Sequence, residues 1–266
     1  MPEWERLRGE LETELGEPIT LDALTGSWKI VQRAGGHRHS VDDVLTADYA
    51  VRAAPEVREL LDLGTGIGTV GLMVLSRLAR DTRLVCVEAQ PISHRLLLAN
   101  IAGNQLEHRV EPHLGDLREL ALPARFGLIT GSPPYFPVGT GVMPADSQKA
   151  HARFELRGDL GDYAHAAARQ LTDDGVFVFC FPAPQRERAI AAVAASGLAL
   201  AASRDVIPRA TLRPLFTVFA CCRGASPPRI DPPLVVRTRE GDITDEMLAI
   251  RRGFGFDANG PMRTGE

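Results

Sequence analysis

The chain has 266 residues, of which 44% are hydrophobic and 24% charged, and its net charge is -4. This length suits one large domain with a full core, and the composition excludes wholesale disorder. Its apolar runs are too short to cross a membrane, and its acidic first segment has the features of neither a signal peptide nor an Arg-rich transit peptide. We therefore expect a globular, cytoplasmic protein that does not bind membranes.

The basic residues are almost all arginine, because Lys29 and Lys149 are the only lysines among 30 basic side chains. Arginine meets phosphate with two parallel hydrogen bonds, although an arginine excess can also reflect genomic bias. A mildly acidic chain does not attract nucleic acid through bulk charge, so any such contact would have to be local.

Neither the cysteines nor the histidines predict a metal site. The cysteines lie in apolar, strand-like stretches without metal-ligand spacing, and we expect reduced core residues at Cys86, Cys180, Cys221 and Cys222. A metal role for His37 and His39 would need further ligands.

The hydrophobic pattern predicts a helix over 3–15, a strand over 28–32 and a helix over 41–53. Strands then alternate with helices: strands at 59–63, 84–88, 109–114, 127–130 and 176–181, and helices from the turn after residue 63 to 80, at 91–102, 163–171 and 185–195. Strands at 198–207 and 215–223 follow in succession, then a strand or extended tail at 234–239 and a helix at 244–252. This alternation predicts an α/β fold with a doubly wound, mostly parallel sheet and one antiparallel member.

We expect a single domain with two additions to its core. Residues 1–55 would form an N-terminal extension, residues 56–225 the core, and residues 226–266 a strand-and-helix appendage of the same domain.

The strand at 59–63 runs directly into a glycine-rich turn, Asp62-Leu63-Gly64-Thr65-Gly66-Ile67-Gly68. Glycines permit a tight turn and close approach of the backbone to a ligand, and the helix that follows offers free N–H groups. Glu88 ends the next strand, where a carboxylate can accept both hydroxyls of a ribose. These features together predict a site for a nucleotide cofactor.

Residues 66–71 also match the G-x-G-x-x-G fingerprint, so a NAD-dependent dehydrogenase stays an alternative. The aspartate before the glycines favours another ligand, because the Asp62 carboxylate would repel a pyrophosphate. S-adenosylmethionine carries an ammonium, a carboxylate and a sulfonium but no phosphate.

The strand at 127–130 leads into a second motif, Gly131-Ser132-Pro133-Pro134-Tyr135-Phe136-Pro137. The carboxyl ends of strands line the ligand crevice of a doubly wound sheet. The two prolines stiffen the loop and cannot donate, which leaves the Ser132 and Pro133 carbonyls free to accept. Beside the flat rings of Tyr135 and Phe136, these acceptors indicate a site for a planar exocyclic amine such as that of adenine.

The two motifs together resemble the class I S-adenosylmethionine-dependent methyltransferases, in the branch whose (Asn/Asp/Ser)-Pro-Pro-(Tyr/Phe) motif methylates exocyclic or amide nitrogen. Residues 36–47 are similar to the segment G-x-R-x-S-x-D-x-x-L-L-A of the bacterial tRNA(Val) adenine-N6 methyltransferase family, and residues 152–155 to its Ala-Arg-His-Glu segment. Ser132 stands where that family usually has Asn, and Phe154 where it has His. The resemblance covers roughly residues 28–225.

This resemblance implies a seven-stranded sheet whose last strand is antiparallel, S-adenosylmethionine as cofactor and tRNA as partner. The cofactor would lie against Arg38, Ser40, Asp42, Asp62, Gly64, Thr65, Gly66, Gly68, Glu88 and Asp116. Glu88 would hold its ribose and Asp116 its adenine amine. The acceptor base would be handled by Ser132, Pro133 and Tyr135, with further substrate contacts from Phe136 and Arg153.

Other acceptors stay open: another RNA, cytosine-N4 in DNA, where Ser-Pro-Pro-Tyr also occurs, or a protein glutamine. Only about 25 residues precede the first predicted strand, fewer than the N-terminal helical domain of release-factor glutamine methyltransferases needs. A cofactor-binding protein without catalysis is an alternative of another class. The oligomeric state is left open.

A last expectation concerns the arginines near the C-terminus. They would either scatter over the surface or form a phosphate-binding rim beside residues 132–137, and comprise Arg204, Arg209, Arg213, Arg223, Arg229, Arg237, Arg239, Arg251 and Arg252, with Arg153 and Arg157.

Overall fold

A computed structural model describes residues 3–224 and 226–256 of the chain. The first two residues of the predicted extension, Ala225 of the predicted core and residues 257–266 of the predicted appendage lie outside the described residues.

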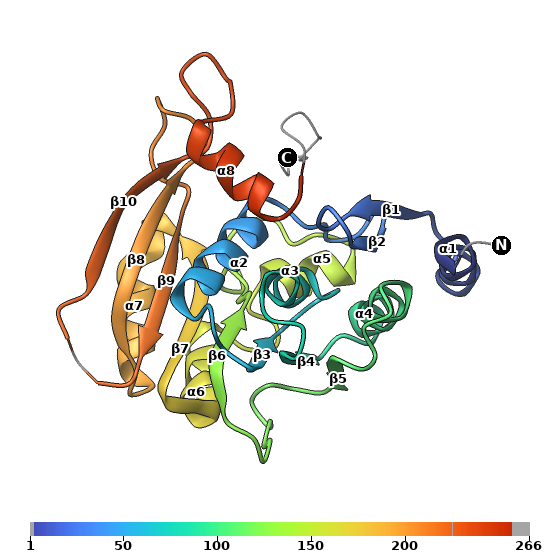
Figure 1. Cartoon of the computed structure of the whole chain (residues 1–266), viewed down its shortest axis with the longest axis horizontal. Helices are drawn as coiled ribbons and strands as arrows, with labels where there is room; N and C mark the ends of the chain where they lie inside the picture. Colours follow the sequence, from blue (N-terminus) through green and yellow to red (C-terminus); the bar gives the residue numbers. More distant parts are fainter. Residues whose placement is uncertain (1–2, 225, 257–266) are drawn as a thin grey trace.

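The centre of the fold is an eight-stranded sheet with the strand order β10-β8-β9-β7-β6-β3-β4-β5 (Figure 1). Its strands are β3 (Glu59–Leu63), β4 (Arg83–Glu88), β5 (Val110–Leu114), β6 (Phe126–Gly131), β7 (Leu171–Pro182), β8 (Ala199–Ile207), β9 (Phe216–Cys222) and β10 (Arg229–Val235). β9 runs antiparallel to β7 and β8, and the other neighbours pair in parallel. The predicted α/β, mostly parallel fold is confirmed.

The sheet has one strand more than the predicted seven. β10 pairs in parallel with β8 at the edge of the sheet. We predicted a strand or tail over 234–239, too late in the chain, because Pro232 and Pro233 interrupt the strand pattern. An edge strand tolerates proline, since one side of it needs no ladder hydrogen bonds, and the register shifts at this point, between Asp231 and Leu234.

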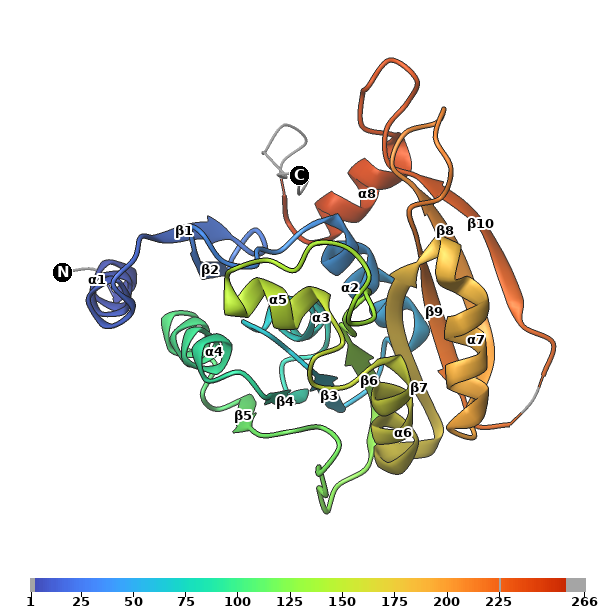
Figure 2. The same cartoon turned by 180° about the vertical axis from the view of Figure 1, so that it is seen from behind.

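Helices cover both faces of the sheet (Figures 1 and 2). One core cluster contains buried residues of α2 (Val41–Ala53), α3 (Thr69–Arg77) and α4 (Pro91–Gly103), and the other those of α6 (Leu160–Gln170) and α7 (Arg186–Ala195). The remaining helical elements are α1 (Glu3–Leu15), α5 (Ser147–Arg153), the 3-10 turn η1 (Ala183–Gln185) and α8 (Asp245–Gly253). No helix in the described part of the chain is long and apolar enough to span a bilayer.

A two-stranded hairpin lies between α1 and the main sheet. It consists of β1 (Ile19–Ala23) and β2 (Lys29–Arg33), which pair in antiparallel fashion. The strand predicted at 28–32 is β2, whereas β1 was missed. α5 was missed as well, because seven residues are too few for a clear helical period.

Two asparagines at the end of α4 hold this hairpin against the main fold. Buried Asn100 accepts the N–H of Val31 at 2.7 Å and donates to the carbonyl of Ile67, in the glycine-rich turn, at 2.9 Å. Asn104 makes a similar pair of bonds to the Lys29 N–H and carbonyl, at 3.0 and 2.8 Å, in a more exposed place.

We expect Asn100→Ala to lower the free energy of unfolding by about 2–4 kcal/mol, because it leaves a buried N–H and a buried carbonyl without partners. Asn104→Ala is the matched control and should cost less than about 1 kcal/mol, since water can replace its bonds. Urea denaturation of both variants tests this, and equal losses would contradict it.

Candidate functional site

The predicted motifs meet at one edge of the sheet. β3 pairs in parallel with both β4 and β6, and Leu63 is in register with Val87 on one side and Gly131 on the other. The glycine-rich turn, Glu88 and Ser132 therefore leave three adjacent strands at the same carboxyl edge, where doubly wound folds bind ligands.

The buried carboxylate of Asp62 organises the start of this edge. Asp62 is 1% exposed and accepts from the hydroxyls of Thr65 and Thr130, at 2.5 and 2.7 Å, and from the N–H of Gly71 at 3.1 Å. These bonds join the end of β3 to the turn, to β6 and to α3. Burial raises the pKa of the Asp62 carboxyl, which these hydrogen bonds oppose. Direct contact of Asp62 with a cofactor stays a prediction.

Two glycines of the turn are required for different reasons. Gly64 and Gly66 both have φ of +59°, which disfavours other residues. A Cβ on Gly64 would collide with the hydroxyl of Tyr163, whereas a Cβ on Gly66 would meet open space. The backbone at Gly66 is thus the part of the turn that a ligand can approach. Gly68 caps the N-terminus of α3.

Glu88 faces the turn from the end of β4. Its carboxylate accepts the N–H of Gly66 at 2.8 Å and that of Gln90 at 2.6 Å. The side chain is 5% exposed, and burial raises the pKa of its carboxyl. The carboxylate is therefore fixed beside the open side of Gly66.

Asp116 follows the end of β5, the strand that pairs with β4. The N–H of Gly115 donates to the Glu88 carbonyl at 2.9 Å, which joins the two segments. Hydrogen bonds from the Arg118 guanidinium, at 2.9 and 2.6 Å, lower the pKa of the Asp116 carboxyl. Asp116 is therefore ionised and partly exposed, and its contact with a cofactor stays a prediction.

The Ser-Pro-Pro-Tyr loop is anchored through its tyrosine. The Tyr135 hydroxyl donates to Asp42 at 2.9 Å and lies 3.0 Å from the Cys180 sulfur. Burial, together with the Asp42 carboxylate, raises the pKa of the Tyr135 phenol, so this group stays protonated. Its ring packs edge-on against Phe181, with 5.8 Å between centroids. Ser40 contacts the other oxygen of Asp42, so both residues brace the tyrosine; their predicted cofactor contacts stay predictions.

The same loop is attached to the segment that follows α5. The N–H groups of Tyr135 and Phe136 donate to the Arg153 carbonyl at 3.1 and 3.0 Å, and the N–H of Glu155 donates to the Phe136 carbonyl at 2.9 Å. Phe154 is 4% exposed and packs on Phe136, with 5.7 Å between ring centroids. Phe154 is thus an apolar support for the Ser-Pro-Pro-Tyr loop.

A buried arginine that we had not predicted holds α5 in place. Arg33, on β2, is 9% exposed and contacts Glu17, the Asp146 carboxylate at 2.7 Å and the Gln148 amide oxygen at 3.1 Å. Asp146 caps α5. Sequence spacing could not reveal this contact, because more than 110 residues separate Arg33 from Asp146.

Arg38 points to the hairpin. Its guanidinium donates to Thr20 and Asp22 of β1, at 2.8 Å each. It therefore braces the segment that precedes α2, and a contact of Arg38 with the cofactor stays a prediction.

The arginines near the C-terminus lie in different surroundings. Arg223 follows the end of β9, which runs antiparallel to β7, and donates to the Ala168 carbonyl, so it lies at the end of the sheet opposite residues 132–137. Arg204 pairs with Glu246 at 2.7 Å, Arg229 pairs with Asp231 at 2.7 Å, and Arg251 is 2% exposed. Arg209, Arg213, Arg237 and Arg239 lie in loops at the carboxyl edge of β8 and beyond β10.

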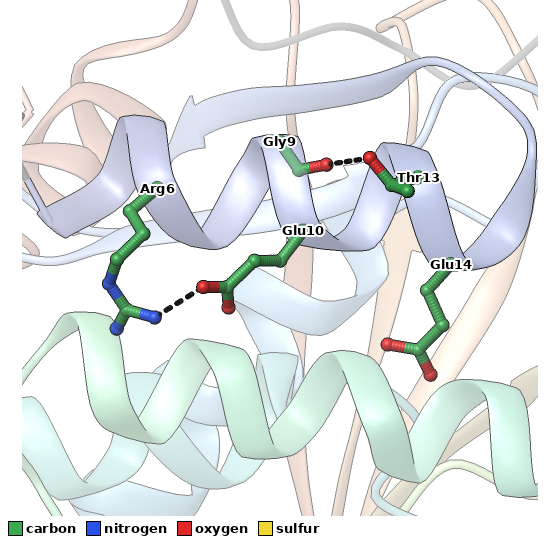
Figure 3. A pocket seen from close by; sticks show the side chains of 5 residues that line it. All are labelled: Arg6, Gly9, Glu10, Thr13 and Glu14. Atoms are coloured by element: carbon green, nitrogen blue, oxygen red, sulfur yellow. Dashed lines mark hydrogen bonds and ion pairs between the residues drawn. The ribbon is translucent and has the colours of Figure 1, made fainter.

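A hollow of about 490 Å³ on α1 lies outside this site (Figure 3). It is lined by Arg6, Gly9, Glu10, Thr13 and Glu14, and none of these is a predicted site residue. Arg6 and Glu10 pair with each other at 2.6 Å, so the hollow is part of the charged surface that α1 turns toward α4.

A family model described as the TRM5/TYW2 methyltransferase domain matches residues 49–130. The matched region contains the glycine-rich turn, Glu88 and Asp116, and it ends just before Ser132.

Curated relatives match this chain over a longer stretch than the family model does. A tRNA1(Val) (adenine(37)-N6)-methyltransferase of Actinobacillus pleuropneumoniae serotype 7 is 28% identical over 141 residues, or 53% of this chain and 58% of the relative. One of Actinobacillus succinogenes is 32% identical over 130 residues, or 48% of this chain and 54% of the relative. The chain belongs to the class I S-adenosylmethionine-dependent methyltransferases. It spans about half the length of the curated relatives it matches.

Solved structures agree with this methyltransferase in fold. A predicted O-methyltransferase of Agrobacterium tumefaciens has a TM-score of 0.60 at 19% identity, covering 80% of this chain and 96% of that one. The M. jannaschii tRNA m1G37 methyltransferase has a TM-score of 0.56 at 14% identity, covering 79% and 58%. At such identities the comparison establishes the fold alone.

The family uses S-adenosylmethionine, and Glu88 is predicted to hold the ribose of this cofactor. If it does, Glu88→Ala should weaken S-adenosylhomocysteine binding about 10- to 100-fold, because a charge-assisted pair of ribose contacts would be lost. Affinity of the unaltered methyltransferase should then fall as pH is lowered, starting at a higher pH than for an exposed glutamate, because the ionised carboxylate would accept the hydroxyls and burial raises the pKa of Glu88. Calorimetry measures both effects. Glu119→Ala, an exposed change near Asp116, is the control, and equal affinity of the Glu88 variant would sink the assignment.

Proposed function

We propose that this methyltransferase transfers a methyl group from S-adenosylmethionine to N6 of an adenine in tRNA. The observation that carries the proposal is the placement of the Ser132–Tyr135 loop directly beside the glycine-rich turn, on neighbouring strands β6 and β3. The named activity of the relatives in Actinobacillus supports the acceptor.

The residues at the turn fit this cofactor. The backbone at Gly66 is open to a ligand, and the Glu88 carboxylate is fixed beside it. Asp116, ionised and partly exposed, suits an amine donor. Glu88 would hold the ribose, Asp116 the adenine amine, and Gly64 and Gly66 would leave room for the methionine end.

Bound S-adenosylmethionine would supply a methyl group on an already cationic sulfur. The protein's task is then to orient the acceptor nitrogen, whose lone pair is normally delocalised into the base. The Ser132 and Pro133 oxygens would accept its two N–H groups and favour a pyramidal nitrogen. This is catalysis by positioning and by preorganised dipoles.

Tyr135 would provide the surface on which the extruded base stacks. Its hydroxyl is already engaged by Asp42 and Cys180, so the ring is the part left for a substrate. Asp42 and Phe181 hold that ring in one orientation.

A second candidate for the methyl acceptor is cytosine-N4 in DNA, and the observation that favours it is the serine at position 132. Ser132 has a shorter reach than the usual asparagine and no side-chain carbonyl. More of the contact with the amine would then fall to the Pro133 carbonyl.

Labelled methyl transfer to total tRNA, rRNA, DNA and protein, followed by nucleoside analysis, tests the proposal. We expect N6-methyladenosine in tRNA. Ser132→Ala and Tyr135→Ala should each lower kcat/KM at least about tenfold, because each removes a contact that orients the base. Ser27→Ala, an exposed serine far along the chain, is the control. Label in DNA cytosine, or full turnover by both variants, would overturn it.

The Asp42→Ala variant distinguishes two possible roles of Asp42, which are positioning of Tyr135 and binding of the cofactor. As a brace, Asp42 acts through the tyrosine hydroxyl, so Asp42→Ala should lower kcat about as much as Tyr135→Phe does. The double variant should be no worse than either single one. Affinity for S-adenosylhomocysteine should change less than about twofold. A large loss of cofactor affinity with additive effects on kcat would support the cofactor role instead.

A further inference from the structure

A groove of about 260 Å³ lies at the carboxyl edge of the sheet, across β7 from the glycine-rich turn. Its walls come from the first residue of α2, the ends of β8 and β10, and the loop of residues 208–215 that joins β8 to β9. In Figures 1 and 2 this loop projects beside the 236–243 loop that precedes α8, and the Ala210 N–H donates to the Arg237 carbonyl at 3.0 Å.

Two sets of contacts connect this groove to the Ser-Pro-Pro-Tyr loop. Val41 lines the groove, and the next residue, Asp42, accepts from the Tyr135 hydroxyl. On the other side, the Leu215 carbonyl accepts from Ala183, and Gln185 of the same 3-10 turn donates to the Tyr135 carbonyl at 2.9 Å. The groove therefore flanks the position proposed for the methylated base.

The positive charge of the 208–215 loop is not neutralised by acidic residues in the loop itself. It contains Arg209 and Arg213 and no acidic residue. Within the part of the chain that the structure describes, neither arginine forms an ion pair, and no described residue lining the groove carries a carboxylate. The 236–243 loop, by contrast, is balanced, with two arginines against Glu240 and Asp242.

The same loop also presents apolar surface. Leu212 and Leu215 are each 56% exposed, and exposed apolar groups gathered at one place mark binding surfaces. The loop is held by backbone bonds from Leu212 to Arg209 and from Leu215 to Val206, at 2.8 Å each. The two arginines and the two leucines therefore come from one loop whose backbone is held in place.

We propose that this groove binds a nucleotide flanking the methylated base, with its phosphate on Arg209 and Arg213 and its base against Leu212 and Leu215. The inference rests on the proposed function and adds a second contact point for the RNA. Pockets that enclose a whole small ligand measure about 300–1,000 Å³, so this smaller groove suits one part of a longer chain. Positive charge without acid favours RNA over a protein partner.

The test measures binding of an unmodified tRNA(Val) transcript by fluorescence anisotropy, at several salt concentrations, in the presence of S-adenosylhomocysteine. Arg209→Ala and Arg213→Ala should each weaken binding about tenfold and reduce the salt slope by about 1. Leu212→Ala with Leu215→Ala should weaken binding about tenfold and leave the salt slope unchanged. Affinity for S-adenosylhomocysteine, measured by calorimetry, should stay within about twofold.

Two control variants remove the same kind of side chain elsewhere. Arg83→Ala removes an exposed arginine at the opposite edge of the sheet, and Ile230→Ala removes an apolar side chain that is 60% exposed on β10. Both should bind tRNA like the unaltered protein. Equal tRNA affinity of the groove variants and these controls overturns the inference. The proposed function is judged by the unaltered protein alone. It stands if this protein methylates tRNA, whatever the groove variants do, and it fails if this protein binds tRNA but methylates none.

Discussion

The fold around the site depends on one buried carboxylate. Asp62 accepts three hydrogen bonds, from Thr65, Thr130 and Gly71, and so joins β3, the glycine-rich turn, β6 and α3 at a single point. Isolated burial of a charge is costly, and these donors offset much of that cost. Because β6 ends at Gly131, one residue after Thr130, and leads into the Ser-Pro-Pro-Tyr loop, the same bonds set the position of both halves of the site.

The N-terminal segment is the second support of the site. Asn100 is hydrogen-bonded to the hairpin and to the glycine-rich turn, and Arg33 of the hairpin contacts the residue that caps α5. Asp42 accepts from the hydroxyl of Tyr135 in the Ser-Pro-Pro-Tyr loop. α5 in turn leads into the segment that pairs with residues 135 and 136. Elements distant in sequence thus fix the Ser-Pro-Pro-Tyr loop from both sides. A loop held in this way can orient a substrate without reorganising during the reaction.

Local sequence patterns predicted most of the core. The alternation of strands and helices depends on neighbouring residues, and so do the turn at Gly64 and Gly66 and the stiff loop after Ser132. These patterns failed where contacts with distant parts of the chain determine the secondary structure. β10 carries two prolines that only an edge strand tolerates, α5 is a single short helix, and β1 depends on its partner β2. Arg33 and Asn100 act through partners far away in sequence. The ion pair of Arg38 with Asp22 was not predicted either, and the contact of Arg38 with the cofactor stays a prediction.

The central claim is that the two motif loops form one site for cofactor and acceptor. A crystal structure of the full chain with S-adenosylhomocysteine tests it most directly. The account predicts the ribose hydroxyls on the Glu88 carboxylate, the methionine end against the backbone at Gly64 and Gly66, and the sulfur facing Ser132 and Tyr135. Ligand bound away from this edge, or with its sulfur turned from the Ser132–Tyr135 loop, would contradict it.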